Sequence, residues 1–200
     1  MEKLSEALEN ENAVRSVSLT DEEKKLIKPL GLLTEKPIIY ATNLGEDELA
    51  KGNSFSEEVN TLATKEGSEC VQISAQVEAE LIELGEEERD DYLNGLGVEE
   101  GGLISLIKAT YRLLGLSTYF TTGEKETKAW TISDGMTAPQ AAGVIHTDFE
   151  KGFIRAQTIS YKKLLEAGSL VEARNKGWLR SEGKEYIVNE GDVMEFLFNV

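Results

Sequence analysis

The chain has 200 residues, enough for one large domain or two small ones. Hydrophobic residues make up 40% of it and charged residues 29%, which excludes a disordered polar chain, and no apolar run approaches the roughly 18 residues that a membrane span needs. The single cysteine, Cys70, excludes an intrachain disulfide and favours a reducing compartment such as the cytoplasm. Because it lies in a predicted strand, Cys70 is expected to be a small buried hydrophobe rather than a reactive thiol.

The net charge of −16 comes entirely from the first half of the chain. Residues 1–100 contain 25 acidic and 9 basic residues, whereas residues 101–200 contain 12 of each. An acidic surface is poorly suited to lie along phosphate backbones, so any RNA contact is expected in the second half. The simpler interpretation is that the acidic residues form a solvated surface.

Two short helices are predicted near the N-terminus. Residues 2–12 form a polar, helix-prone stretch. Thr20 and Glu23 have the spacing of a capping box, which predicts the start of a second helix, and Pro29 limits its length.

The next segment alternates between strand and helix patterns. The apolar run at 37–43 predicts a strand buried on both faces of a parallel sheet, and residues 70–74 predict a second strand. Ser54 and Glu57 form a second capping-box pattern before the helix that joins these strands, and another helical pattern covers 77–84. This order is typical of a βαβ unit.

The pattern changes near residue 116. Residues 103–114 predict an amphipathic helix that Gly115 ends. Beyond it the sequence predicts a small α+β domain, with strands at 117–122, 127–132, 153–159, 186–188 and 193–198, a hairpin loop at Gly123-Glu124-Lys125, and a helix at 138–145.

The usual catalytic motifs are missing from the sequence. No G-x-x-x-x-G-K-[ST] phosphate-binding loop is present, and the only Gly-Lys pair, Gly183-Lys184, is followed by an acid. One histidine is too few for a multi-histidine metal site and makes a hidden triad improbable. We therefore assign no catalytic residue and no metal ligand.

A short motif stands at the end of each strand of the βαβ unit. Asn43, Leu44 and Glu46 come after the first strand, and Ser74 and Ala75 come after the second. Ligands of open α/β sheets bind beyond the carboxyl ends of the strands. An asparagine there can bridge a purine edge and a neighbouring loop, while an acid can accept from ring N–H groups. The two motifs together predict a nucleotide-base site.

Four stretches resemble the YchF family of Obg-related, ribosome-binding P-loop ATPases: PIIYATNLGEDE, EGSECVQISAQVEAELIEL, the run from TYFTTGEKE to FIRAQTIS, and GKEYIVNEGDVMEFLFNV. The resemblance implies an α/β partial P-loop nucleotide-binding domain followed by an α+β β-grasp (ubiquitin-like) TGS domain, with a short N-terminal helical arm. Residues 1–30 would be the end of a helical coiled-coil insertion, 31–116 the second half of the nucleotide-binding domain, and 117–200 the TGS domain.

The family's base-recognition motif corresponds to Asn43, Leu44 and Glu46, where ordinary GTPases have Asn-Lys-x-Asp. Glu46 is one methylene longer than Asp, and Leu44 replaces the lysine with an apolar surface, so the resemblance implies a preference for ATP over GTP. Ser74-Ala75 corresponds to the second base-contacting loop. The phosphate loop and magnesium ligands of the family precede the region that this chain resembles, so the chain alone is expected to lack ATPase activity.

The resemblance also implies a ribosome contact through the TGS domain, with RNA as a further partner and no membrane. The basic stretch at 161–184 has six basic and three acidic residues and is the best candidate for phosphate contacts. The contact candidates are His146, Lys162, Lys163, Arg174, Lys176, Trp178, Arg180 and Lys184. A solvated face remains the alternative for the basic residues, and a bond between a His146 imidazolium and a helix C-terminus or a carbonyl the alternative for His146. The leading hypothesis is the C-terminal part of a ribosome-associated ATPase; the alternative is a stand-alone, non-enzymatic TGS module that binds ribosome or RNA.

Overall fold

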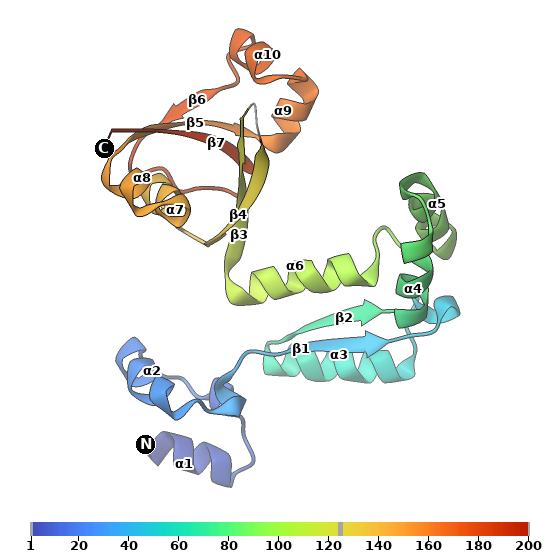
Figure 1. The fold of residues 1–200 in the computed structure, drawn as a ribbon. Coiled ribbons are helices and arrows are strands. Elements are labelled where there is room, and N and C mark those ends of the chain that lie inside the picture. Colours follow the sequence, from blue (N-terminus) through green and yellow to red (C-terminus); the bar gives the residue numbers. More distant parts are fainter. Residues whose placement is uncertain (1, 124–125, 200) are drawn as a thin grey trace. The chain divides into compact units, whose positions relative to one another are not determined.

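The computed structural model of the chain describes residues 2–123 and 126–199 (Figure 1). It divides into two compact units, Met1–Leu113 and Leu114–Val200. Glu124 and Lys125, at the centre of the expected hairpin loop, lie outside the described residues. Within the described ranges, no helix has the length and apolar character that crossing a membrane requires.

The first unit begins with two short helices, as expected. They are α1 (Glu2–Glu9) and α2 (Asp21–Ile27). Between them lies the 3-10 turn η1 (Val14–Ser16), and after them follow η2 (Lys28–Leu30) and η3 (Leu33–Glu35). The predicted capping box is confirmed, because the Thr20 hydroxyl accepts the Glu23 N–H at 3.2 Å and Glu23 Oε2 accepts the Thr20 N–H at 2.8 Å. Pro29 lies in η2, directly after α2.

A two-stranded parallel sheet follows, and it confirms the βαβ prediction. β1 (Ile39–Asn43) pairs with β2 (Glu69–Ile73), and η4 (Glu46–Glu48) and α3 (Ser54–Glu66) connect them. The expectation that the first strand is buried on both faces is wrong, because every residue of β1 is half-buried or exposed. The physical reason is that β2 is its only partner strand in the described part of the chain.

The cap of α3 also differs from the prediction. Asn53, not Ser54, is the capping residue: its side-chain oxygen accepts the Ser56 N–H, and Ser56 Oγ accepts the Asn53 N–H, both at 2.9 Å. Asn53 has an extended backbone, with φ −141° and ψ 175°, while Ser54 is already helical. A cap requires the last non-helical residue, so the pair Ser54 and Glu57 is one position late.

Three helices complete the first unit: α4 (Ala75–Glu83), α5 (Glu86–Leu96) and α6 (Gly102–Leu114). The sequence predicted α4 and α6 but not α5. Buried Val77 and Leu81 of α4 pack with Leu93 of α5 and with Leu49, which follows η4. This small core attaches α5 to the segment that leaves β1.

The second unit is built on a five-stranded mixed sheet with the strand order β4-β3-β7-β5-β6 (Figure 1). In this sheet β3 and β7 are parallel, and the other neighbouring strands pair antiparallel. The strands are β3 (Leu116–Thr122), β4 (Thr127–Ser133), β5 (Phe153–Ser160), β6 (Arg180–Glu182) and β7 (Asp192–Phe198), and the helices are α7 (Ala138–Ile145), α8 (Thr147–Lys151), α9 (Tyr161–Ala167) and α10 (Leu170–Asn175). The arrangement is consistent with a β-grasp fold.

Small residues of α7 allow it to pack closely on the sheet of the second unit. Ala138, Ala141 and Ala142 are fully buried against a core that includes Tyr119 and Met194. A second cluster, around Ile159, Ala173 and Val193, lies under α9 and α10.

The strand expected at 186–188 is not formed. This segment makes only one isolated bridge, between Thr137 and Ile187. Its backbone bonds go to the start of α7, since Ala138 N–H donates to the Tyr186 carbonyl and Val188 N–H donates to the Met136 carbonyl.

Candidate functional site

The two loops that follow β1 and β2 meet at the carboxyl end of the parallel sheet. Asn43 Oδ1 accepts the backbone N–H of Ala75 at 2.9 Å, and the Leu44 N–H donates to the Ile73 carbonyl at 2.8 Å. The in-register pairing of Asn43 with Ile73 places the ends of both strands side by side. The structure therefore brings Asn43 and Leu44 beside Ser74 and Ala75, which are four of the five residues that the sequence singled out as a base site.

These residues differ in how much they expose. Asn43 and Ala75 are exposed and Glu46 is half-buried. Leu44 and Ser74 are only 7% and 1% exposed, and Ser74 Oγ accepts the Val77 N–H at 3.5 Å as the cap of α4. Asn43, Glu46 and Ala75 thus form the accessible part, although the Ala75 N–H is already donated to Asn43, while Leu44 offers little surface to a ligand in this structure.

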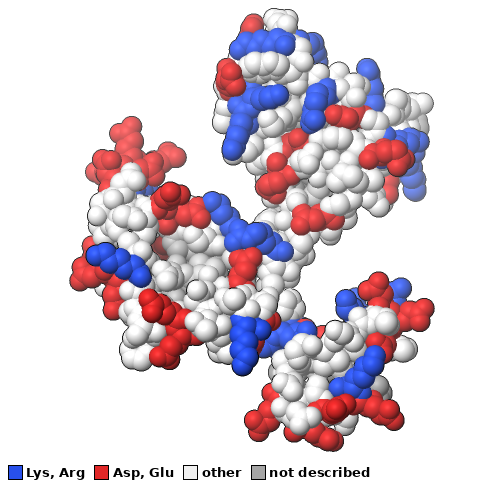
Figure 2. Space-filling view, turned by 180° about the vertical axis from the view of Figure 1, so that it is seen from behind, with Lys and Arg blue, Asp and Glu red and all other residues white. Residues whose placement is uncertain are grey.

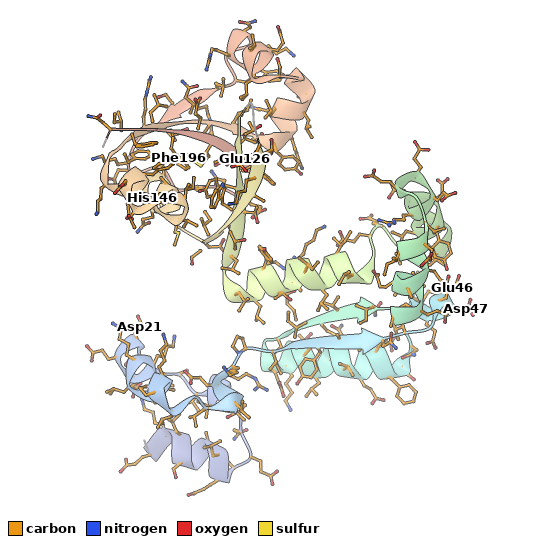
Figure 3. The ribbon with its side chains drawn as sticks, in the orientation of Figure 1. Asp21, Glu46, Asp47, Glu126, His146 and Phe196 are labelled. Atoms are coloured by element: carbon orange, nitrogen blue, oxygen red, sulfur yellow. The ribbon has the colours of Figure 1, made fainter. Side chains whose placement is uncertain are left out.

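Glu46 has a neighbour that the sequence did not predict. The Tyr92 hydroxyl of α5 lies 3.4 Å from Glu46 Oε1 and donates a short bond of 2.6 Å to Glu80 Oε2. The bond to the Glu80 carboxylate raises the pKa of Tyr92 to about 12 and lowers the pKa of Glu80. In Figure 3, Glu46 lies just beyond the carboxyl end of β1 and beside α4. Tyr92 was missed because α5 itself was not predicted.

His146 lies at the junction of α7 and α8 in the second unit (Figure 3). Nδ1 accepts the backbone N–H of Asp148 at 3.2 Å, so the ring caps the start of α8, and the same nitrogen lies 3.5 Å from Asp148 Oδ2. His146 is also the C-cap residue of α7, and the interaction of an imidazolium with that helix end stays a prediction. The side chain remains 60% exposed, which leaves most of the ring accessible.

The basic stretch divides into exposed and internally engaged residues. Lys162 and Lys163 of α9 are exposed, as are Lys176 and Lys184. Figure 2 shows Lys and Arg side chains along the α9–α10 end of this unit. Arg174 donates to Gln157 at 3.0 Å. The four lysines of this stretch are therefore exposed, whereas Arg174 makes a side-chain bond within the unit.

Arg180 and Trp178 have structural roles in the second unit. Arg180 donates to the Tyr186 hydroxyl at 2.9 Å and lies 3.7 Å from the buried carboxylate of Asp192. Trp178 is half-buried against the cluster under α9 and α10, and the Lys176 ammonium lies 4.6 Å from its ring centre. Trp178 is therefore partly withdrawn from solvent, whereas Arg180 stays exposed while it makes these bonds.

In residues 2–123 and 126–199, no group of three or more His, Cys, Asp or Glu side chains is arranged to hold a metal ion. Cys70 is half-buried in β2.

Comparison with known proteins identifies the family. A family model described as "YchF-GTPase_C: Protein of unknown function (DUF933)" matches residues 116–199. The chain is 50% identical over its whole length to a protein of Bacillus subtilis and 52% identical to one of Escherichia coli O157:H7, both named ribosome-binding ATPase YchF. The chain belongs to the YchF family. It corresponds to the C-terminal portion of these relatives and spans 55% of the length of each.

One solved structure agrees with this family assignment, and a second shares only the fold. The YchF GTPase of Schizosaccharomyces pombe matches 98% of this chain and 53% of its own, with a TM-score of 0.80 and 34% identity. A GTP-binding protein of Pyrococcus horikoshii shares the fold, with a TM-score of 0.56 and 16% identity over 99% of this chain and 64% of its own.

Proposed function

We propose that this chain is the C-terminal part of a ribosome-associated ATPase, in which the loops after β1 and β2 bind the adenine base of ATP. The bacterial relatives are named ribosome-binding ATPases, whereas the fission-yeast structure is named a GTPase. The choice of base is therefore the property that the candidate site has to explain.

The hydrogen bond between Asn43 and Ala75 carries the proposal. It leaves the Asn43 amide NH₂ free to donate to a purine ring nitrogen, while Glu46 supplies a carboxylate three residues later. An aspartate at the Glu46 position fits guanine with two parallel bonds to N1–H and the 2-amino group. The extra methylene of Glu46 displaces that pair of oxygens, so guanine loses its two-pronged contact and ATP is preferred over GTP.

The domain assignment is part of the same proposal. Residues 1–30 end a helical insertion, residues 31–116 form the second half of a nucleotide-binding domain, and residues 117–200 form a TGS domain that contacts the ribosome. The division of the structure near Leu113 and the family match at 116–199 support the last boundary. The setting that we propose is the cytoplasm.

The triphosphate and magnesium need groups that this chain does not supply. A phosphate-binding loop cradles phosphates with backbone N–H groups and a lysine, and no such motif occurs in the 200 residues. The chain alone is expected to bind the base weakly, with a dissociation constant on the order of 1 mM, and to release no phosphate from ATP.

Nuclear magnetic resonance of the ¹⁵N-labelled chain tests the base site. Titration with AMP is expected to shift the amide signals of Leu44, Glu46 and Ala75. The Asn43→Ala variant should weaken AMP binding by roughly fivefold, the worth of one net hydrogen bond. Asn60→Ala, at an exposed position on α3, is the matched control and should bind as wild type does.

Two results would contradict the base site. One is the absence of any AMP response at these amides at millimolar concentration, and the other is an equal response to a pyrimidine nucleotide. The exposed lysines of α9 favour the second candidate, a non-enzymatic module that binds ribosome or RNA. That candidate predicts ribosome binding by the chain without any AMP response.

A further inference from the structure

Tyr92 links α5 to the candidate base site. Its ring packs against the small core of Leu49, Val77, Leu81 and Leu93, so the position of the hydroxyl is set by buried apolar contacts. From there the hydroxyl reaches Glu80 at 2.6 Å and Glu46 Oε1 at 3.4 Å.

The geometry around the hydroxyl is asymmetric. The single phenolic proton is divided unequally between two acceptors: the bond to Glu80 Oε2 is short, and the hydroxyl also donates a longer bond to Glu46 Oε1. Glu80 in turn accepts from Gln76 at 3.1 Å, which fixes its carboxylate on α4. Glu80 therefore orients the phenol, and the phenol hydroxyl in turn contacts Oε1 of Glu46.

We propose that Tyr92 positions the Glu46 carboxylate and occupies its Oε1 side, which leaves a one-oxygen acceptor that disfavours guanine. Guanine presents two adjacent donors, N1–H and the 2-amino group, and a carboxylate matches them only with both oxygens. Adenine presents a single donor on that edge, its 6-amino group, so one oxygen is sufficient. This role of Tyr92 as a specificity-determining residue rests on the proposed base site.

The test compares AMP and GMP binding by nuclear magnetic resonance in matched tyrosine variants of the full 200-residue chain. Tyr92→Phe should narrow the preference for AMP over GMP by roughly three- to tenfold, chiefly through tighter GMP binding. Tyr40→Phe is the control, because the Tyr40 hydroxyl also donates to a glutamate, Glu66, at 2.9 Å from the same unit. It should keep the wild-type preference.

A second readout does not depend on nucleotide. The ¹³C chemical shift of the Glu46 side-chain carboxylate at neutral pH should move in Tyr92→Phe and stay unchanged in Tyr40→Phe. Thermal melts confirm that both variants fold.

The outcomes separate the two proposals. If the wild type responds to AMP and Tyr92→Phe discriminates as the wild type does, the role of Tyr92 is overturned and the base site stands. If no variant responds to purine nucleotides, the base site fails. In that case an unchanged Glu46 carboxylate signal in Tyr92→Phe overturns the positioning by Tyr92 as well.

Discussion

The side chain of Tyr119 stabilises the core of the second unit in several ways. It is fully buried in the second unit, its hydroxyl donates to the Ala141 carbonyl at 2.9 Å, and its ring meets Phe196 edge-on at 5.8 Å between ring centres. Burial raises the pKa of Tyr119 above its ordinary value of about 10. The phenolate form is therefore excluded from the folded unit at pH values where the unfolded chain ionises.

The stability of the second unit should fall as the pH rises above about 10. Below that pH the phenol is protonated in both states, and above it the unfolded chain loses the proton while the folded unit retains it. One such tyrosine lowers the free energy of unfolding by up to about 1.4 kcal/mol for each further pH unit. At neutral pH, Tyr119→Phe should be about 1 kcal/mol less stable than wild type, because the bond to Ala141 is lost. Its free energy of unfolding should then fall less steeply as the pH rises above about 10.

Urea unfolding between pH 8 and 11, followed by tryptophan fluorescence, measures this effect. Both tryptophans, Trp130 and Trp178, lie in the second unit and report on it alone. The core variant Met194→Leu controls for lowered stability without a change in titration. Identical alkaline slopes in wild type and Tyr119→Phe would show that this tyrosine does not limit alkaline stability.

At the scale of elements, the start of α3 depends on one side chain. Asn53→Ala removes the acceptor for the Ser56 N–H and a bond of 3.0 Å to Glu48, so it should destabilise the first unit by about 1 kcal/mol. Ser54→Ala is the matched control and should stay within about 0.5 kcal/mol of wild type. Thermal unfolding followed by far-ultraviolet circular dichroism compares the two, and a larger loss in Ser54→Ala would contradict the observed cap.

Elements with a strong period or a clear boundary residue were predictable from the sequence. The capping box at Thr20 and the stop at Gly115, where φ is +60°, are local signals that need no tertiary information. The approach of Asn43 to Ala75 was also predictable, since parallel strands bring their carboxyl ends to one edge.

Other features depend on contacts between distant residues. The segment at Tyr186–Val188 has strand-like composition, but its backbone bonds go to α7. α5 is rich in charge and shows little apolar periodicity, so the contacts of Leu93 and Tyr92 with α4 become visible only in the folded unit. Tyr92, the neighbour of Glu46, could not be assigned to the site for that reason.

At the scale of the whole molecule, charge is distributed unequally between the two units. Residues 1–100 carry the entire net charge of −16, whereas residues 117–200 contain 10 basic and 12 acidic residues. Acidic side chains are spread over the first unit in Figure 2. A partner rich in phosphate should therefore be repelled by the first unit and meet much less net repulsion at the second.

If the second unit contacts the ribosome through phosphates, reversing the exposed lysines of α9 should weaken binding. Lys162→Glu with Lys163→Glu is the informative pair, because Arg180 is engaged by Tyr186 and Asp192 and its reversal would disturb the fold. In a plot of log affinity against log salt concentration, each lost phosphate contact reduces the magnitude of the slope by about one. The double variant should therefore co-sediment less with ribosomes at low salt and show a slope smaller by about two.

The matched control reverses two exposed lysines of the first unit, Lys25→Glu with Lys51→Glu, and changes the net charge by the same amount. It should pellet with ribosomes nearly as wild type does across the salt series. An equal loss in both double variants would mean that total charge, not the α9 surface, governs the interaction. If neither variant differs from wild type, the lysines of α9 form a solvated surface and the exposed ring of His146 becomes the next candidate contact.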